Sequence, residues 1–154
     1  MNINLFSKEN CQPCKNADAL LTSKEVEFKK QVLDKDFDMI TIGEQFPTAK
    51  TFPIIEIDGN YIGGFADLVK IFEMNDLLQE NINTRTCNIK FLKANGELRE
   101  MRCTRNLDVI PKEFHPKADS KKTSNDDIIV VFDLEKNGWR SFNKYRLTEV
   151  VIND

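Results

Sequence analysis

Polar and apolar residues alternate at the start of the chain and then change to a helical period. Residues 2–6 and 26–32 alternate as half-buried strands do. Between them Ala17, Leu20 and Leu21 have helical spacing, which predicts a helix that ends near residue 23. The chain is therefore expected to begin as strand, helix, strand.

The next segment predicts two helices on either side of two short strands. A helix is predicted at 35–46, and strands at 54–57 and 61–62. The later helix has one apolar face, which we expect to pack under a sheet. That face consists of Phe65, Leu68, Val69 and Phe72. Residues 75–85 are polar and predict the end of this helix followed by a short connector.

Period two returns in the second half, on either side of the hairpin signal Asn95-Gly96. A two-residue turn would put the apolar residues of the two strands on different faces. A three-residue loop with Gly96 in the left-handed conformation keeps one apolar face, so we expect this register. The predicted cross-strand pairs are Lys93 with Glu97, Ile89 with Met101, and Cys87 with Cys103. Two interpretations of the cysteine pair stay open, buried thiols or a disulfide, and a reducing compartment favours the thiols.

The remaining chain predicts more short strands, at 128–132, at 139–142 after the turn Asn137-Gly138, and at 146–152, with a polar loop at 117–127. About five short strands in this half favour a small closed barrel. Charge changes at the same place. Residues 1–80 carry a net charge of −6 and the remainder +3, within a total of −3. We expect two domains, at 1–78 and 86–154.

Two thiols, Cys11 and Cys14, bracket two residues between the first strand and the first helix. A cysteine attacks disulfides as a thiolate. A helix N-terminus stabilises an anion through its free N–H groups, and Lys8 and Lys15 add positive charge nearby. Pro13 suits the first helical turn, since it lacks an N–H. We expect Cys11 to attack a disulfide and Cys14, about one turn on, to resolve the mixed disulfide.

Other interpretations of the two thiols are a zinc half-site or structural cysteines. Cys87 and Cys103 do not form the second close pair that a zinc ribbon needs, so redox chemistry is favoured and no metal is expected.

Three motifs in order resemble the glutaredoxin family over residues 1 to about 75. They are Ser7-Lys8 before the CxxC, Thr51-Phe52-Pro53 in the place of the family's TVP, and Ile62-Gly63-Gly64-Phe65 in the place of its IGG turn. The resemblance implies an α/β thioredoxin-like fold, a four-stranded mixed sheet flanked by helices. It also implies that Pro53 is cis and faces Cys11, so that the backbone of Phe52 can pair with an extended cysteinyl peptide.

The resemblance implies glutathione as reductant or co-substrate, with no bound cofactor. Carried over residue by residue, Lys8 lies toward the glycine carboxylate of glutathione, and Gln12 stands where an aromatic residue often lines the groove. Thr51, Phe52 and Pro53 hold its cysteinyl segment. Its γ-glutamyl end is expected at the N–H groups that open the last helix of this domain, those of Gly64, Phe65 and Ala66.

Two departures from the family pattern bear on glutathione binding. The usual CPYC is CQPC here, which removes an aromatic wall. Position 66, often Asp in the family, is Ala66, which removes a side chain that would pair with the glutathione amine. Asp67 is a partial substitute.

The second half resembles a family of small SH3-like barrels found mostly in bacteriophages. The resemblance rests on residues 101–104, 110–111, 131–134 and 139–142. It implies an all-β SH3-like barrel domain after the glutaredoxin domain and carries no activity with it.

The sequence therefore predicts a thiol–disulfide oxidoreductase that acts on glutathione and disulfide-containing proteins. For a phage glutaredoxin the resemblance implies ribonucleotide reductase as one electron acceptor. The alternative is a redox-regulated interaction module whose barrel binds a protein or nucleic acid, although a net charge of +3 gives little reason to expect nucleic acid. No apolar run is long enough to span a membrane. A monomer in the cytoplasm is expected, that of a bacterial host if the protein is phage-encoded.

Overall fold

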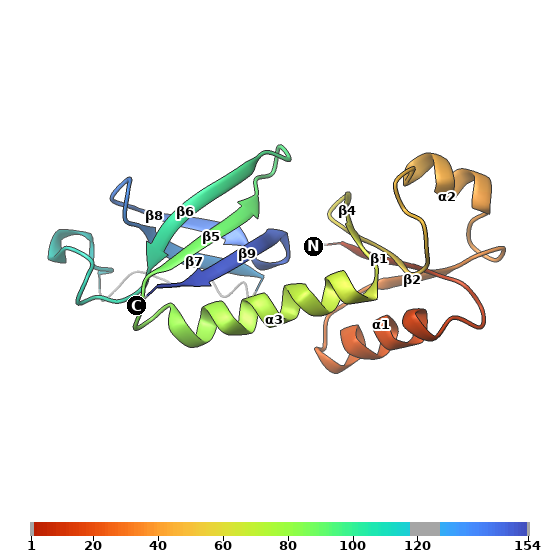
Figure 1. Cartoon of the computed structure of the whole chain (residues 1–154), viewed down its shortest axis with the longest axis horizontal. Coiled ribbons are helices and arrows are strands. Elements are labelled where there is room, and N and C mark those ends of the chain that lie inside the picture. Colours follow the sequence, from red (N-terminus) through yellow and green to blue (C-terminus); the bar gives the residue numbers. More distant parts are fainter. Residues whose placement is uncertain (1, 118–126, 154) are drawn as a thin grey trace. The chain divides into compact units, whose positions relative to one another are not determined.

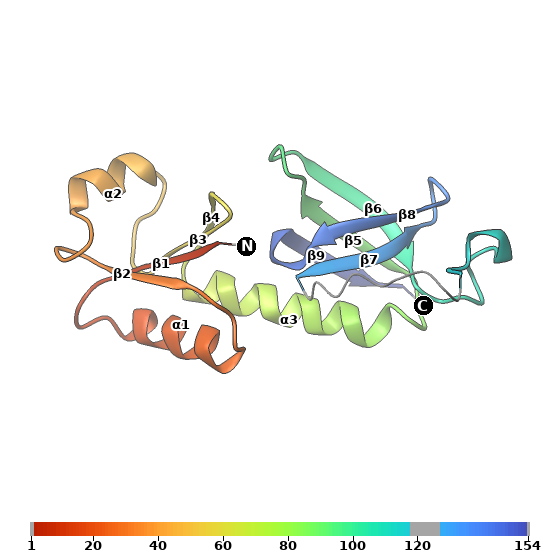
Figure 2. The same ribbon diagram turned by 180° about the vertical axis from the view of Figure 1, so that it is seen from behind.

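The structure is a computed structural model that describes residues 2–117 and 127–153. The chain forms two compact units, Met1–Lys70 and Ile71–Asp154, each described here by itself. Most of the predicted loop at 117–127 falls outside the described residues. Figure 1 labels the helices and strands of both units except β3, which Figure 2 labels.

The first unit contains a four-stranded mixed sheet in the order β2-β1-β3-β4. The two leading strands are parallel and the other pairs antiparallel. The strands are β1 (Ile3–Ser7), β2 (Lys29–Val32), β3 (Ile54–Ile57) and β4 (Asn60–Gly63). Helix α1 (Gln12–Ser23) and the start of α3 (Phe65–Asn81) lie on one side of this sheet, and α2 (Met39–Gln45) lies toward the other (Figures 1 and 2). This arrangement confirms the predicted order of elements.

Helix α2 is shorter than predicted. It begins at Met39 because Asp38 caps it, with the Asp38 carboxylate accepting the Thr41 N–H at 2.7 Å. This hydrogen bond is the main cause that lowers the pKa of Asp38. The residues before it turn instead, with Leu33 in a parallel bridge to Phe37. The prediction of a helix at residues 35–38 was wrong, because the polar residues of this stretch form a turn and the N-cap of α2.

Helix α3 ends at Asn81, within the polar stretch that was predicted to hold the end of this helix and a short connector. Its buried positions recur at three- and four-residue spacing and lead into the following turn: Leu68, Ile71, Asn75, Leu78 and Ile82. The buried face thus differs from the predicted one. The ring of Phe72 meets Tyr145 edge-on within the second unit, with centroids 6.0 Å apart.

The second unit is a five-stranded antiparallel sheet in the order β8-β7-β6-β5-β9. The strands are β5 (Cys87–Leu92), β6 (Leu98–Thr104), β7 (Ile128–Asp133), β8 (Gly138–Asn143) and β9 (Leu147–Ile152), with short 3-10 turns at Lys112–Phe114 and Lys144–Arg146. Figure 2 shows these strands curling beside the later turns of α3. The core contains Leu78 and Ile82 together with inward residues of the strands. Strand β7 was predicted to be buried, but Ile128 and Val130 face outward.

The predicted hairpin register is confirmed. Cys87 pairs with Cys103, Gly96 has φ +86°, and the Lys93 N–H donates to the Glu97 carbonyl at 2.8 Å. Both cysteines are free thiols with no exposed surface. Burial, with smaller contributions from Cys87 and Asp133, raises the pKa of Cys103 to about 12.

Candidate functional site

Cys11 is the N-cap residue of α1, as predicted. Its backbone is extended, and the Cys14 N–H points at Cys11 Sγ from 3.2 Å. Pro13 occupies the first helical turn, where its missing N–H costs nothing. A directed N–H and the positive end of a helix both favour negative charge on this sulfur when the protein is reduced.

Cys11 and Cys14 form a disulfide, with their Cα atoms 5.3 Å apart. The two cysteines differ in access. Cys11 is 6% exposed and lines a groove, whereas Cys14 is 3% exposed, is absent from the groove lining, and lies on the buried face of α1 with Ala17 and Leu21. An incoming thiol or disulfide therefore meets Cys11.

The peptide bond between Phe52 and Pro53 is cis, as the family resemblance implied. Pro53 lines the same groove as Cys11, and Cys11 Sγ lies 3.8 Å from the carbonyl oxygen of Phe52. The segment before β3 is thus next to the redox cysteine.

The groove beside Cys11 has a volume of about 1160 Å³ and lies entirely within the first unit. It collects all but one of the residues predicted from the sequence. Those that line it are Lys8, Cys11, Gln12, Thr51, Phe52, Pro53, Gly64, Phe65 and Ala66. The exception is Cys14. Residues from three separate stretches of chain, the loop after β1, the loop before β3 and the start of α3, therefore meet around one sulfur.

Phe52 forms an aromatic wall in this groove. Its ring stacks on Phe37 with centroids 6.1 Å apart, and Phe37 in turn meets Phe6 edge-on at 5.4 Å. The Lys8 ammonium lies over the Phe52 ring, 5.8 Å from its centroid. Gln12 contributes less to the groove, since its side-chain amide donates to Asn16 on α1 at 2.9 Å. An aromatic residue is thus present in the groove although the CxxC loop lacks one.

The start of α3 presents backbone N–H groups, but one of them is already occupied. The Gly64 N–H donates to the Asp67 carboxylate at 3.0 Å, the reciprocal bond of a capping box. The N–H groups of Phe65 and Ala66 remain for a ligand. Asp67 itself also lines the groove.

Several groove residues were missed by the sequence reasoning. They are Asn10, Pro13, Leu33, Met39, Thr48, Lys50 and Tyr61, whereas Asp67 had been named beside the expected glutathione site. Met39 and Tyr61 are exposed apolar side chains, 57% and 38% accessible. No local sequence pattern identifies such positions, because they reach the site only when α2 packs on the sheet and β4 pairs with β3.

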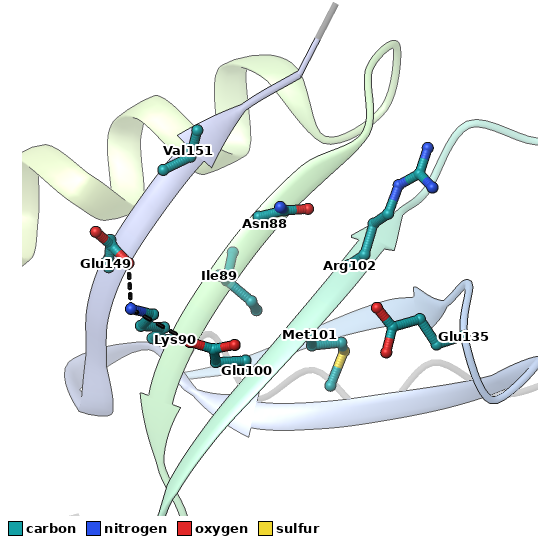
Figure 3. Close-up of a pocket in the computed structure, with 9 residues that line it drawn as sticks. All are labelled: Asn88, Ile89, Lys90, Glu100, Met101, Arg102, Glu135, Glu149 and Val151. Atoms are coloured by element: carbon teal, nitrogen blue, oxygen red, sulfur yellow. Dashed lines mark ion pairs between the residues drawn. The ribbon is translucent and has the colours of Figure 1, made fainter.

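A second pocket, of about 270 Å³, lies on the outer face of β9, β5 and β6 in the second unit (Figure 3). Lys90 stands in its middle and forms ion pairs with Glu149 at 3.1 Å and Glu100 at 3.3 Å. These pairs raise the pKa of Lys90. The central cation is therefore already neutralised by the sheet's own carboxylates, and the pocket offers a mixed-charge surface.

Among the described residues, no three side chains of the types His, Cys, Asp and Glu come together as metal ligands. Nor does any helix in the described part of the chain have the length and apolar character needed to cross a membrane.

Comparisons with known proteins match the two halves separately. The glutaredoxin family matches residues 3–62, and WYL_2, a Sm-like SH3 β-barrel fold, matches residues 75–148. Glutaredoxin 3 of Escherichia coli K12 is 38% identical over 71 residues, which are 44% of this chain and 81% of the relative. An uncharacterized 11.5 kDa protein of the Gp31-cd intergenic region of Enterobacteria phage T4 is 31% identical over 78 residues, 50% of this chain and 76% of the relative.

Several solved structures similar to this chain are glutaredoxins. The buckwheat glutaredoxin–glutathione complex has 24% identity and a TM-score of 0.44, and covers 50% of this chain and 73% of its own. The dithiolic glutaredoxin 2-C-Grx1 of Trypanosoma brucei brucei has 29% identity and a TM-score of 0.43, and covers 49% of this chain and 80% of its own.

The sheet order, the disulfide at a helix N-terminus and the cis proline beside it define the class of the first unit, a thiol–disulfide oxidoreductase with a thioredoxin-like fold. Its 38% sequence identity with glutaredoxin 3 of Escherichia coli K12 fixes the family within that class. The chain belongs to the glutaredoxin family through its first half, followed by an SH3-like barrel.

Proposed function

We propose that the protein reduces protein and glutathione mixed disulfides, with Cys11 as the nucleophile and Cys14 as the resolving thiol. The observation that carries this proposal is the shared groove, in which Cys11 lies among the residues predicted to bind glutathione while Cys14 is buried behind it.

The reaction balances as two successive exchanges. The Cys11 thiolate attacks one sulfur of the substrate disulfide, and the other sulfur leaves as a thiolate that takes up a proton. Cys14 then attacks the Cys11 sulfur and releases the second substrate thiol. The substrate gains two electrons and the protein becomes the Cys11–Cys14 disulfide. Two glutathione thiols restore the dithiol and form glutathione disulfide.

We propose glutathione as the reductant because the groove offers matching charges. Lys8 lines the groove and would pair with one carboxylate of glutathione. The N–H groups of Phe65 and Ala66, at the start of α3, would bind its other carboxylate. Position 66 carries no carboxylate for the glutathione amine, and Asp67 is the only acidic side chain among the described lining residues. Pro53 and Thr51 are proposed to hold the cysteinyl part.

The test is a turnover assay on 2-hydroxyethyl disulfide with two alternative electron sources. One contains glutathione with glutathione reductase, and the other contains thioredoxin reductase. We expect turnover with glutathione and none with Cys11→Ser. Turnover in the assay with thioredoxin reductase and none in the assay with glutathione would show that glutathione is not the reductant.

Further parts of the proposal concern the physiological setting. We propose ribonucleotide reductase as one protein acceptor, a monomeric state, and action in a reducing cytoplasm, which the dithiol requires for its own reduction. We also propose that the chain has two functional domains, at 1–78 and 86–154, and that the barrel domain has no redox role.

A further inference from the structure

The groove beside Cys11 extends past the residues assigned to glutathione. Leu33, Met39, Thr48 and Lys50 line it as well. Its volume of about 1160 Å³ exceeds the range of roughly 300–1,000 Å³ that is usual for small-molecule sites. The additional part is therefore available to a chain longer than a tripeptide.

Met39 gives this extension an apolar surface. Helix α2 is anchored by Ile42 and Phe46, which are 3% and 5% exposed, and this anchoring leaves Met39 57% exposed at the groove. A thioether on an unbranched chain adapts to apolar partners of different shapes. Ile40, the next residue, is 76% exposed but does not line the groove.

The apolar wall next to this surface is held in place by packing. Phe37 and Phe52 pack against a cluster that contains Phe6, Ile42 and Phe46. Phe52 therefore needs no rearrangement to receive a ligand, and a preformed wall lowers the entropic cost of binding.

The charges of the groove favour an acidic ligand. Lys8 and Lys50 line it, and neither forms an ion pair within the part of the chain that the structure describes. The carboxylate of Asp67 accepts the Gly64 N–H. The groove thus has positive charge in a half of the chain whose net charge is negative.

We propose that this extension binds an extended acidic segment of a protein disulfide substrate. An apolar side chain of that segment contacts Met39 and Leu33, and its carboxylates lie toward Lys8 and Lys50, while its disulfide meets Cys11. The inference rests on the proposed role of Cys11 as nucleophile. The chemistry is the two-step exchange described above, in which the segment leaves with a free thiol.

The experiment uses single turnovers of the full chain, reduced beforehand and freed of reductant. Two synthetic peptides are compared, each with one cysteine in a mixed disulfide with 2-mercaptoethanol and flanked by leucine. One carries glutamates beside the leucine and the other carries lysines in their place. The reference substrate is 2-hydroxyethyl disulfide, and acid-quenched samples are quantified by mass spectrometry.

We expect the native protein to reduce the acidic peptide about fivefold faster than the basic one. Met39→Gln should lower the rate ratio of acidic peptide to reference substrate by about threefold, because part of the Met39 surface is buried by the ligand. The matched control is Ile40→Gln, a change at the neighbouring exposed position outside the groove, which should leave that ratio unchanged.

Equal rates for the two peptides, or equal effects of Met39→Gln and Ile40→Gln, would overturn the proposal. Because no glutathione is present, the result does not depend on the physiological reductant. If the reduced protein fails to reduce even 2-hydroxyethyl disulfide, the proposed function fails and this inference fails with it.

Discussion

At the scale of single residues, the four cysteines occupy two opposite environments. Cys11 lines a groove and receives an N–H from the start of a helix. Cys87 and Cys103 have no exposed surface, and burial raises the pKa of both thiols. Their pairing also opposes a cross-link. They continue the alternation from the hydrogen-bonded pair Lys93–Glu97, so they form another such pair, in which side chains stand further apart.

We expect Cys103 to resist alkylation in the folded protein. Its pKa of about 12 leaves it as an unreactive thiol at about pH 8, whereas the reduced Cys11 reacts. The measurement is iodoacetamide labelling followed by peptide mass spectrometry, with a sample in denaturant as the control. The direction in which pH changes the free energy of unfolding follows from the pKa of Cys103 in the unfolded chain, which is 9.0. The contribution of Cys103 is fully present below about pH 9 and is lost as the pH rises toward 12. Rapid labelling of Cys103 in native protein would contradict this expectation.

At the scale of elements, the segment between α3 and β5 is held by one buried hydroxyl at the end of β6. Thr104 Oγ1 donates to the Arg85 carbonyl at 2.9 Å and accepts the Asn106 N–H at 3.0 Å. Beside it, the Arg105 N–H donates to the Ile82 carbonyl at 2.8 Å. The short connector after α3 is therefore fixed by hydrogen bonds to the barrel.

Thr104→Val should destabilise the second unit by about 1–3 kcal/mol, because it keeps the shape of the side chain but leaves buried backbone groups without a partner. Chemical denaturation followed by the fluorescence of Trp139 measures this change. Thr104→Ser keeps the hydroxyl and should cost less. A larger loss for serine than for valine would mean that the packing of the methyl group, and not the hydroxyl, matters.

The sequence was most informative where a short-range rule applied and least where a helix boundary depended on distant contacts. The hairpin register followed from Gly96 and the need for one apolar face. The start of α2 could not be found in this way. Asp38 acts as a cap only when the preceding residues turn, and the polar end of α3 is helical because Asn75, Leu78 and Ile82 are buried by the barrel. The groove was predicted through its motif residues, but Met39 and Leu33 were missed, since neither belongs to a motif.

At the scale of the whole molecule, a single helix belongs to both units. The division between them falls after Lys70, within α3. Leu68 is fully buried in the first unit and Leu78 is fully buried in the core of the second. Each unit therefore depends on its own stretch of one continuous helix.

Two matched substitutions on this helix should separate the units. Leu78→Ala should destabilise the barrel by about 2–5 kcal/mol and leave disulfide reduction intact, and Leu68→Ala should destabilise the redox unit by a similar amount. Hydrogen exchange resolved by peptide reports the stability of each unit, and the turnover assay reports function. Loss of reductase activity in Leu78→Ala at temperatures where the redox unit is folded would show that the units are energetically coupled.

The burial of Cys14 restricts both half-reactions, the reduction of the disulfide by an external thiol and the reduction of a substrate by the dithiol. An external thiolate must approach along the line of the S–S bond, and Cys11 is the half of the oxidised pair that lines the groove. Reduction of the protein by a small thiol and its attack on a polypeptide disulfide therefore both pass through a mixed disulfide at Cys11, one with the small thiol and the other with the polypeptide. Both ligands must occupy the same groove in turn, so they compete for it.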